Sequence, residues 1–268
     1  MIKTNFHTHS TYCDGKNTPE EMVLEALNKG FTHLGFSGHS FFDDSEEYSM
    51  SEDSEKAYFG EINALKEKYK DKIQILCGIE QDYFSKPVKY PYDYKIGSVH
   101  YILKNNEFLV IDGSVDELSK ILAKHYNGNF DLFAKDYFEV VGNVAEKTGA
   151  DIIGHFDLIL KNQERIGYTP TAMFYNCAEK AVLKLLKYNI PFEINTGAIA
   201  RGYRTTPYPD FKILKFICNN GGNIIINSDC HQKEYLDCEF EAARDLAIKA
   251  GFKKQAILTK DGVKYIEL

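Results

Sequence analysis

Short apolar runs alternate with longer amphipathic segments along almost the whole chain, and this alternation constrains the fold more than any other feature of the sequence. The runs are rich in β-branched residues, as strands are, and the segments between them carry apolar side chains at helical spacing. A strand repeatedly followed by a helix predicts a mainly parallel sheet with covering helices. We expect strands at residues 2–6, 33–37, 73–79, 94–99, 151–154, 192–195 and 223–227. We expect helices at residues 19–29, 52–69, 115–126, 130–148, 171–188, 210–220 and 234–250.

The segments outside this alternation predict no second domain. No linker rich in proline, glycine or serine divides the 268 residues, so we expect one domain over residues 1–268. Residues 256–268 predict a closing β-hairpin with a Lys-Asp-Gly turn. The acidic residues 43–55 predict a solvated loop at the rim of the sheet or barrel.

Charge and composition exclude several classes of partner. The chain has 39 acidic and 32 basic residues and a net charge of -7, which argues against binding to long nucleic acids. No apolar stretch is long enough to span a bilayer, and the N-terminus has no apolar signal region, so we expect no membrane partner and a cytoplasmic location. The six cysteines form no Cys-x-x-Cys pair, so we expect them to be reduced. The sequence does not indicate an oligomeric state.

Six of the eight histidines stand at or just after the carboxyl end of an expected strand. In parallel sheets and barrels these strand ends form the face where ligands bind. One histidine on a strand is more often a core residue than a ligand, but eight N/O side chains placed in this way indicate a shared site. The set is His7, His9, His39, Glu80, His100, His155, Asp229 and His231.

The spacing and the chemistry of these residues predict a metal cluster. The pair His7 and His9 and the pair Asp229 and His231 have i, i+2 spacing, which places both members of a pair on one side of an extended chain. Neutral imidazoles and carboxylates without thiolates suit Zn, Mn, Fe or Co. So many ligands at one mouth predict more than one ion.

At this point the sequence resembles the PHP (polymerase and histidinol phosphatase) superfamily, and within it the monofunctional histidinol-phosphatases. The resemblance runs from residue 7 to residue 231, and the motifs are specific as a set although each alone is weak. They are the His-x-His opening followed by Asp14-Gly15, then Ser-Gly-His39, Gly-Ile-Glu80, Gly-Ser-Val-His100, Gly-His155-Phe-Asp and Ser-Asp229-Cys-His231.

The resemblance implies an α/β fold, a distorted (β/α)7 barrel, with three divalent transition-metal ions (zinc, manganese or iron) at the carboxyl-terminal face of the strands. It also implies a ligand set for each ion. The first ion takes His7, His9, Glu80 and Asp229, the second shares Glu80 and adds His100 and His155, and the third takes His39, His231 and Asp14. Some relatives have histidine in place of Asp14. By the same resemblance the candidate catalytic residues are Glu80, Asp229 and His231.

The placement of the arginines is a second signal. Only four of the 32 basic residues are arginines, and three of the four lie in loops after expected strands. Because guanidinium groups bind phosphate bidentately, we expect Arg165, Arg201 and Arg204 to bind a phosphate, although solvated loop arginines would give the same pattern. Arg244 lies within an expected helix and is interpreted as a surface residue. The phrase Gly-Tyr-Arg-x-x-Pro-Tyr-Pro, which contains Arg204, resembles the histidinol-phosphatase branch in particular.

Three more polar residues are candidates for supporting roles. Asp82 and Asp157 each lie two residues after a proposed ligand, where they could orient an imidazole or bind a substrate ammonium. Asn195 ends the sixth expected strand, and we expect it to contact phosphate or a bound water.

These observations and the resemblance together favour a metal-dependent phosphomonoesterase that hydrolyses L-histidinol phosphate, a small-molecule substrate, in histidine biosynthesis. Two alternatives stay open. One is another PHP phosphoesterase, acting on nucleotides or phosphotyrosine or as a proofreading exonuclease, although the acidic composition counts against the exonuclease. The other is a catalytically silent metal-binding module, since a fold and its ligands do not prove turnover.

Overall fold

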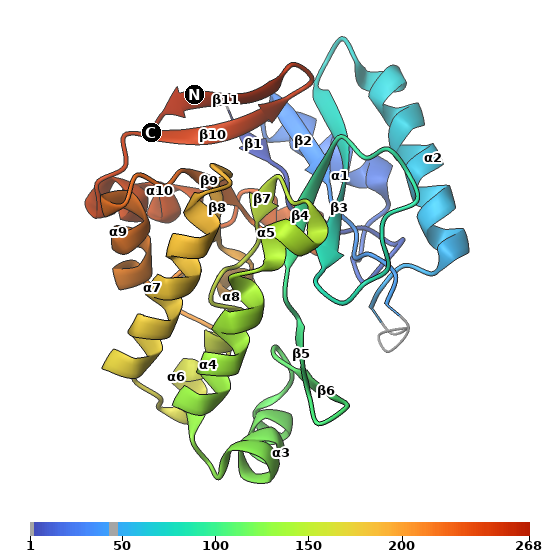
Figure 1. Ribbon diagram of the computed structural model, residues 1–268. Coiled ribbons are helices and arrows are strands. Elements are labelled where there is room, and N and C mark those ends of the chain that lie inside the picture. Colours follow the sequence, from blue (N-terminus) through green and yellow to red (C-terminus); the bar gives the residue numbers. More distant parts are fainter. Residues whose placement is uncertain (1–2, 43–47) are drawn as a thin grey trace.

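Seven parallel strands form one sheet that curls into a nearly closed barrel with helices around it (Figure 1). The computed structural model describes residues 3–42 and 48–268. The order of the strands is β1-β2-β3-β4-β7-β8-β9, so each strand lies beside the next barrel strand along the chain. This arrangement confirms the predicted (β/α)7 barrel. The strands are β1 Thr4–Asn5, β2 His33–Phe36, β3 Gln74–Asp82, β4 Tyr94–Ser98, β7 Ile152–Ile153, β8 Phe192–Asn195 and β9 Ile224–Asn227.

The first and last strands meet only near their carboxyl ends. There Thr8 and Cys230 form a parallel bridge, with the amide of His9 donating to the carbonyl of Cys230 at 2.9 Å. Two residues earlier, a side chain takes the place of a backbone hydrogen bond between the two strands, because the amide of Phe6 donates to Oδ1 of Asn227 at 2.8 Å. The barrel is therefore closed by backbone pairing at the end where the predicted ligands lie.

The helices cover the outside of the barrel, with α1 and α2 on one side and α4, α7, α9 and α10 on the other (Figure 1). Helix α1 begins as predicted, because Thr18 and Glu21 form a capping box and Pro19 occupies the first turn. The helices are α1 Pro19–Asn28, α2 Glu52–Tyr69, α3 Val115–Tyr126, α4 Phe130–Val141, α5 Val144–Thr148, α6 Gln163–Ile166, α7 Ala172–Leu186, α8 Gly197–Ala200, α9 Phe211–Asn219 and α10 Phe240–Ala250. Two short 3₁₀ turns are η1 Leu158–Leu160 and η2 Lys233–Tyr235.

Two predicted helices are wrong in their bounds. The segment 130–148 is not one helix, since α4 ends at the cap Gly142 and α5 starts after Asn143. The segment 234–250 becomes helical only from Phe240, because Glu239 adopts a left-handed conformation with φ of 55°. Apolar spacing continues through both breaks, so periodicity alone does not reveal them.

Tyr94 fills the inside of the barrel. Its single hydroxyl proton is shared between the carbonyl oxygens of Phe6 and Phe36, which lie 2.5 and 2.9 Å away, and its ring lies against Gly35 and Gly78. A Cβ at either glycine would overlap this ring, so the two neighbouring strands need glycine at these positions. The aromatic plug ties β1, β2, β3 and β4 together beneath the polar mouth.

Two antiparallel hairpins are added to the barrel. The predicted closing hairpin is confirmed as β10 Lys254–Thr259 and β11 Gly262–Glu267, which lies at the end of the barrel opposite α3 (Figure 1). The sequence did not predict the second hairpin, β5 Tyr101–Lys104 and β6 Glu107–Val110. Its turn residues Asn105 and Asn106 both have positive φ, as in a type I′ turn. The overlooked signal in the sequence is this pair of asparagines, a residue type that tolerates positive φ.

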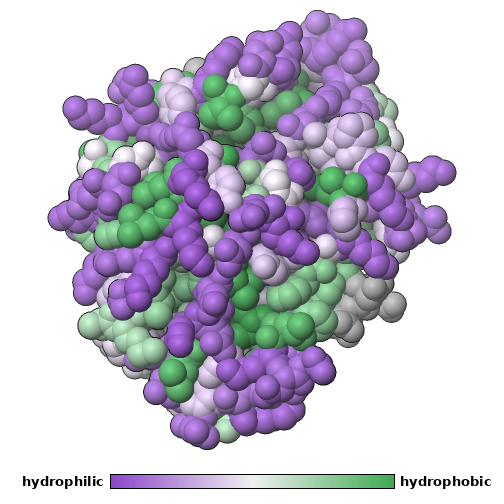
Figure 2. Space-filling view, in the orientation of Figure 1, coloured by the Kyte–Doolittle hydropathy of each residue, from purple (hydrophilic) through white to green (hydrophobic). Residues whose placement is uncertain are grey.

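Within the described residues no helix is both long and apolar enough to cross a membrane. On the face drawn in Figure 2, hydrophilic side chains surround and separate the apolar patches. Of the acidic stretch predicted as a rim loop, residues 43–47 lie outside the described residues, and the part from Glu52 onward is the first turn of α2.

Candidate metal centre

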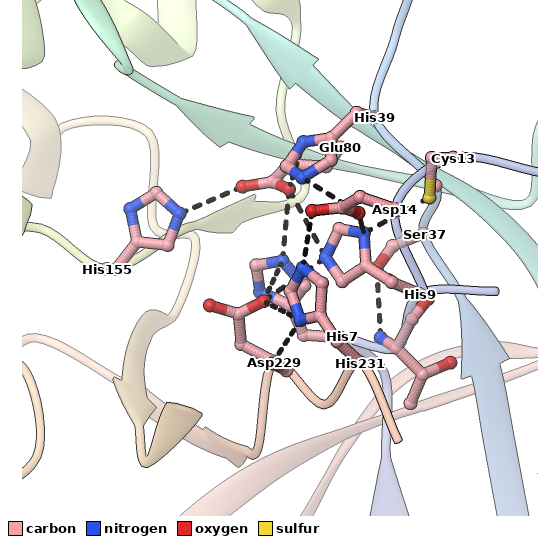
Figure 3. A network of polar contacts seen from close by, with 12 residues as sticks. His7, His9, Cys13, Asp14, Ser37, His39, Glu80, His155, Asp229 and His231 are labelled. Carbon is pink, nitrogen blue, oxygen red and sulfur yellow. Dashed lines mark hydrogen bonds and ion pairs between the residues drawn. The ribbon is translucent and has the colours of Figure 1, made fainter. Parts of the chain in front are cut away.

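All of the ligands predicted from the sequence lie together at the carboxyl end of the barrel, and Figure 3 labels all of them except His100. All except Asp14 come from the end of a strand or from the first residues after it, and together they span the barrel mouth. His7 and His9 follow β1, Asp14 lies in the next turn, His39 follows β2, Glu80 lies in β3, His100 follows β4, His155 follows β7, and Asp229 and His231 follow β9.

Glu80 stands at the middle of the cluster, and its two oxygens face different histidines. Oε1 lies 2.9 Å from Nε2 of His155 and 3.5 Å from Nε2 of His100. Oε2 lies 2.9 Å from Nδ1 of His39 and 3.2 Å from Nε2 of His7. A buried carboxylate with imidazoles on both oxygens has the geometry that a bridge between two ions requires.

Asp229 faces the other side of the same histidines. Its Oδ1 lies 3.1 Å from Nε2 of His9 and 3.6 Å from Nε2 of His7. The residue has φ of 47°, a left-handed conformation that aspartate tolerates better than most residues. This turn directs the carboxylate into the mouth immediately after β9 ends.

Asp14 joins the cluster with the partners that the resemblance assigned to it. Its Oδ2 lies 3.1 Å from Nε2 of His231, and its Oδ1 lies 3.7 Å from Nε2 of His39. The geometry adds His9, whose Nδ1 is 3.7 Å from Oδ1. Gly15 makes the turn possible, because a Cβ there would overlap the backbone of Ser10. Asp14, His9, His39 and His231 form one of the residue groups that could hold an ion.

Several buried atoms in the cluster have no hydrogen-bond partner, and except for Nδ1 of His155 they face the centre of the cluster. An unsatisfied buried polar atom costs about 1–3 kcal/mol, so proteins rarely keep a group of them without a ligand. A divalent metal is the group that imidazole nitrogens and carboxylate oxygens would satisfy together, so the residues fit a metal centre. The orphaned atoms are Nε2 of His7, Nε2 of His9, Oδ1 of Asp14, Oε2 of Glu80 and Nδ1 of His155.

Two ligands already have the protonation state that metal binding needs, whereas burial is outweighed by nearby carboxylates that raise the pKa of His7, His39 and His100, which would lose a proton to a metal. Burial, together with the nearby His231 and His39, lowers the pKa of His9 to about 3, so its imidazole is neutral and keeps a lone pair. Burial would raise the pKa of Glu80, but the surrounding imidazoles, His7 first, hold it well below its usual range. Metal ligands need these forms, a neutral imidazole and an ionised carboxylate.

Glu193 was missed in the sequence although it organises half of the cluster. It lies in β8, fully buried, and Oε1 lies 2.7 Å from Nδ1 of His7 while Oε2 accepts from the amide of His155 at 2.9 Å. Asn195 and Asn227 donate to the same carboxylate at 2.9 and 3.0 Å. A carboxylate on the far nitrogen of a ligating histidine fixes its ring and tautomer. The overlooked signal is a glutamate in an otherwise apolar strand, Phe-Glu-Ile-Asn.

The three supporting residues named from the sequence have different positions. Asp82 orients an imidazole as predicted, since Oδ2 lies 3.2 Å from Nδ1 of His100 and also accepts its amide at 2.8 Å. Asn195 is buried, and its side chain contacts Glu193, Asp229 and the amide of Gly197. Asp157 instead accepts the amide of Asp210 at 2.7 Å, so it holds a loop rather than a ligand.

Of the three predicted phosphate-binding arginines, Arg201 lies at the cluster. Its Nη2 is 3.0 Å from Oδ2 of Asp229, and its Nη1 is 2.9 Å from Nδ1 of His231. It also lines the cavity that opens above the cluster. A guanidinium at this position can reach an anion held in the cavity.

Arg204 and Arg165 use their donors elsewhere. Arg204 is buried outside the cavity lining, donates to the carbonyls of Leu160 and Thr206 at 3.1 and 3.2 Å, and stacks on a tyrosine ring. Arg165 donates to the carbonyl of Gly202 at 3.0 Å. These contacts do not support the expectation that either residue binds phosphate. Loop carbonyls attract guanidinium groups as phosphate does, and arginine placement cannot separate the two.

The cavity above the cluster has a volume of about 580 Å³, within the range of roughly 300–1,000 Å³ that small-molecule sites occupy. The candidate ligands form its floor, and Leu158, Tyr203 and Tyr208 contribute apolar and aromatic wall. Lys16 and Lys161 line it beside Arg201, so cations surround the cluster. This arrangement can hold a small anion above the candidate metal ligands.

A protein-family model described as PHP domain matches residues 5–197, which is most of the chain and all but two of the candidate ligands. The chain belongs to the PHP domain family. The predicted resemblance is thereby confirmed at the level of the family, and the ligands after β9, Asp229 and His231, lie beyond the matched segment.

This PHP chain is similar to named relatives along nearly its whole length. A Schizosaccharomyces pombe protein named "Probable histidinol-phosphatase" is 27% identical, over 95% of this chain and 89% of the relative. The Bacillus subtilis histidinol-phosphatase is 23% identical, over 90% of this chain and 98% of the relative. The solved histidinol phosphate phosphatase of Lactococcus lactis, complexed with Zn, L-histidinol and phosphate, has a TM-score of 0.73 at 22% identity and covers 98% of both chains.

Proposed function

We propose that this PHP protein is a metal-dependent phosphomonoesterase that hydrolyses L-histidinol phosphate to L-histidinol and inorganic phosphate. The observation that carries the reaction class is the Glu80 cluster, in which buried, unsatisfied ligand atoms lie beside Arg201 beneath a small-molecule cavity. The relatives support the choice of substrate, because the names above are histidinol-phosphatases and the L. lactis structure holds both products of this reaction.

The cluster has enough ligands for three ions, which we take to be zinc, manganese or iron. In the described residues, four overlapping groups of ligand atoms lie close enough to hold an ion, and four residues belong to two groups each: His7, His9, His39 and Glu80. When bound, such ions activate water and neutralise phosphate charge. We propose the ligand sets His7, His9, Glu80 and Asp229 for one ion, Glu80, His100 and His155 for a second, and Asp14, His39 and His231 for a third.

The protein's own residues position the substrate and keep the ligands in place. Arg201 would bind the phosphate oxygens that gain charge as the ester bond breaks, which is the main requirement of phosphoryl transfer. Glu193 and Asp82 hold His7 and His100 from behind, so the ligand rings do not reorient when substrate enters. Among the ligands, Glu80, Asp229 and His231 lie nearest to Arg201 or to the centre of the cluster, and we assign the catalytic role to them.

A substrate panel tests this function. One purified, metal-loaded sample is assayed for phosphate release from histidinol phosphate, p-nitrophenyl phosphate, nucleotides and phosphotyrosine peptides. We expect kcat/KM for histidinol phosphate to exceed the others by at least about tenfold, or roughly 1.4 kcal/mol. Preference for a nucleotide or a phosphopeptide would assign the enzyme to another PHP activity. Absence of phosphate release from every ester would favour a non-catalytic metal-binding module.

A further inference from the structure

Asp112 is a cavity residue that neither the sequence analysis nor the metal centre explains. It is the second residue after the β5–β6 hairpin, and the residue between them, Ile111, donates its amide to the carbonyl of the ligand His100 at 2.8 Å. The side chain of Lys161 donates to the carbonyl of Asp112, and Asn162 donates to the next carbonyl, Gly113, at 2.8 Å. The hairpin and two side chains therefore fix this residue beside the histidine end of the cluster.

The carboxylate of Asp112 differs from every other acid in the described part of the cavity lining. The other three, Asp14, Glu80 and Asp229, belong to the metal cluster, whereas Asp112 contacts no candidate ligand by hydrogen bond or ion pair. Its side chain is 35% exposed, and its Oδ2 lies 3.5 Å from Nζ of Lys161. At that distance the lysine compensates the charge without enclosing it, so the carboxylate can accept a second cation.

The electrostatic setting keeps Asp112 ionised and places it toward the cluster. Burial would raise the pKa of Asp112, but Lys161 and then His100, His155 and Arg201 lower it. All four of these groups line the same cavity, so the carboxylate of Asp112 acts electrostatically on a ligand bound there.

We propose that Asp112 binds the ammonium group of the substrate and so selects phosphate esters whose leaving alcohol carries an amine. This inference rests on the proposed function. In histidinol phosphate the amine is on the carbon next to the one that bears the ester oxygen, so an ester held by the metals and Arg201 keeps its ammonium close to the cavity floor. A fixed carboxylate at the wall discriminates between substrates, because an analogue without the amine leaves the carboxylate with only its 3.5 Å contact to Lys161.

A cycle of two substrates and two enzymes tests the assignment. The substrates are L-histidinol phosphate and its deamino analogue, which keeps the imidazole and has hydrogen in place of the amine. The wild-type enzyme should prefer histidinol phosphate, and Asp112→Asn should lower kcat/KM for histidinol phosphate by roughly 10- to 100-fold while changing that for the analogue less than about threefold. Asp116→Asn, which alters an exposed aspartate of α3 paired with Lys120, is the matched control and should change neither.

The outcomes separate the assignment from the proposed function. Equal loss on both substrates, or no loss on either, would overturn the role of Asp112 while leaving the phosphatase intact. A wild-type enzyme that hydrolyses neither ester would overturn the proposed function and this assignment with it. Inhibition constants for L-histidinol and for its deamino analogue make the same comparison with ligands that are not hydrolysed. The wild-type enzyme should bind L-histidinol at least about tenfold more tightly than the analogue.

Discussion

The two ends of the barrel are made by the same seven strands, yet they satisfy their side chains in opposite ways. At the amino end, Leu76, Ile225 and Ile257 pack with Tyr94, whose hydroxyl has two carbonyl acceptors. At the carboxyl end, buried nitrogen and oxygen atoms face one another without hydrogen-bond partners. The amino end therefore stabilises the fold by itself, whereas the buried polar atoms of the carboxyl end lower its stability until a ligand binds and gives them partners.

The largest effect should come from the centre of the polar end. Glu80→Gln removes the charge that faces five histidines, so we expect loss of bound metal and a fall in phosphatase kcat/KM of at least about a thousandfold, or roughly 4 kcal/mol. Metal content by elemental analysis and phosphate release check this on one sample. Glu67→Gln on α2, where the glutamate is 79% exposed, is the control. A Glu80→Gln enzyme that keeps its metals would show that Glu80 is not the bridge.

Replacing two arginines in turn tests which of them belongs to the polar end of the barrel. Arg201→Ala should keep metal content but lower kcat/KM by roughly 10- to 1,000-fold, or about 1.5–4 kcal/mol, because a charged donor to the transition state is lost. Arg204→Ala should instead lower the free energy of unfolding by about 1–3 kcal/mol, because two loop carbonyls lose their donor. Arg244→Ala, on α10, is the control for both measurements. Equal losses of kcat/KM in Arg201→Ala and Arg204→Ala would mean that Arg204 binds phosphate after all.

The smallest effect on turnover should come from the apolar end. Ile257→Ala removes a buried side chain between β10 and the barrel, so we expect the free energy of unfolding to fall by about 2–4 kcal/mol. Denaturant unfolding measures this, and kcat/KM of the folded enzyme at 25 °C should stay within about twofold of wild type. A large kinetic loss without a change in metal content would mean that the two ends are coupled.

The sequence predicted the polar end better than its surroundings. The eight strand-end ligands could be found because strand ends in a parallel barrel converge, whatever the lengths of the helices between them. Asp14 could be placed only through the resemblance, because it lies in a turn whose course depends on Gly15 and on no strand.

What the sequence could not predict depends on partners that are distant in the chain. The sequence alone gives no reason for Glu193 to lie in a buried strand. The reason is its contacts, because its carboxylate oxygens accept from the ring of His7 and from the amide of His155. Arg204 and Arg201 have the same local sequence signal, and only their contacts in the folded chain, such as that of Arg204 to Leu160 and that of Arg201 to Asp229, separate their roles. Asp112 was hidden because the β5–β6 hairpin interrupts the alternation of strand and helix.

The most direct test of the metal-centre account is to follow folding, metal content and activity of one wild-type sample through chelation and reconstitution. The metal-free protein should keep its circular dichroism spectrum, because the apolar end and the barrel do not depend on the ions, and it should melt at a lower temperature because ligand binding stabilises the native state. Phosphate release from histidinol phosphate should vanish and then return as zinc or manganese is added, with up to three ions bound per chain. Full activity in a sample shown to be free of metal would contradict the account.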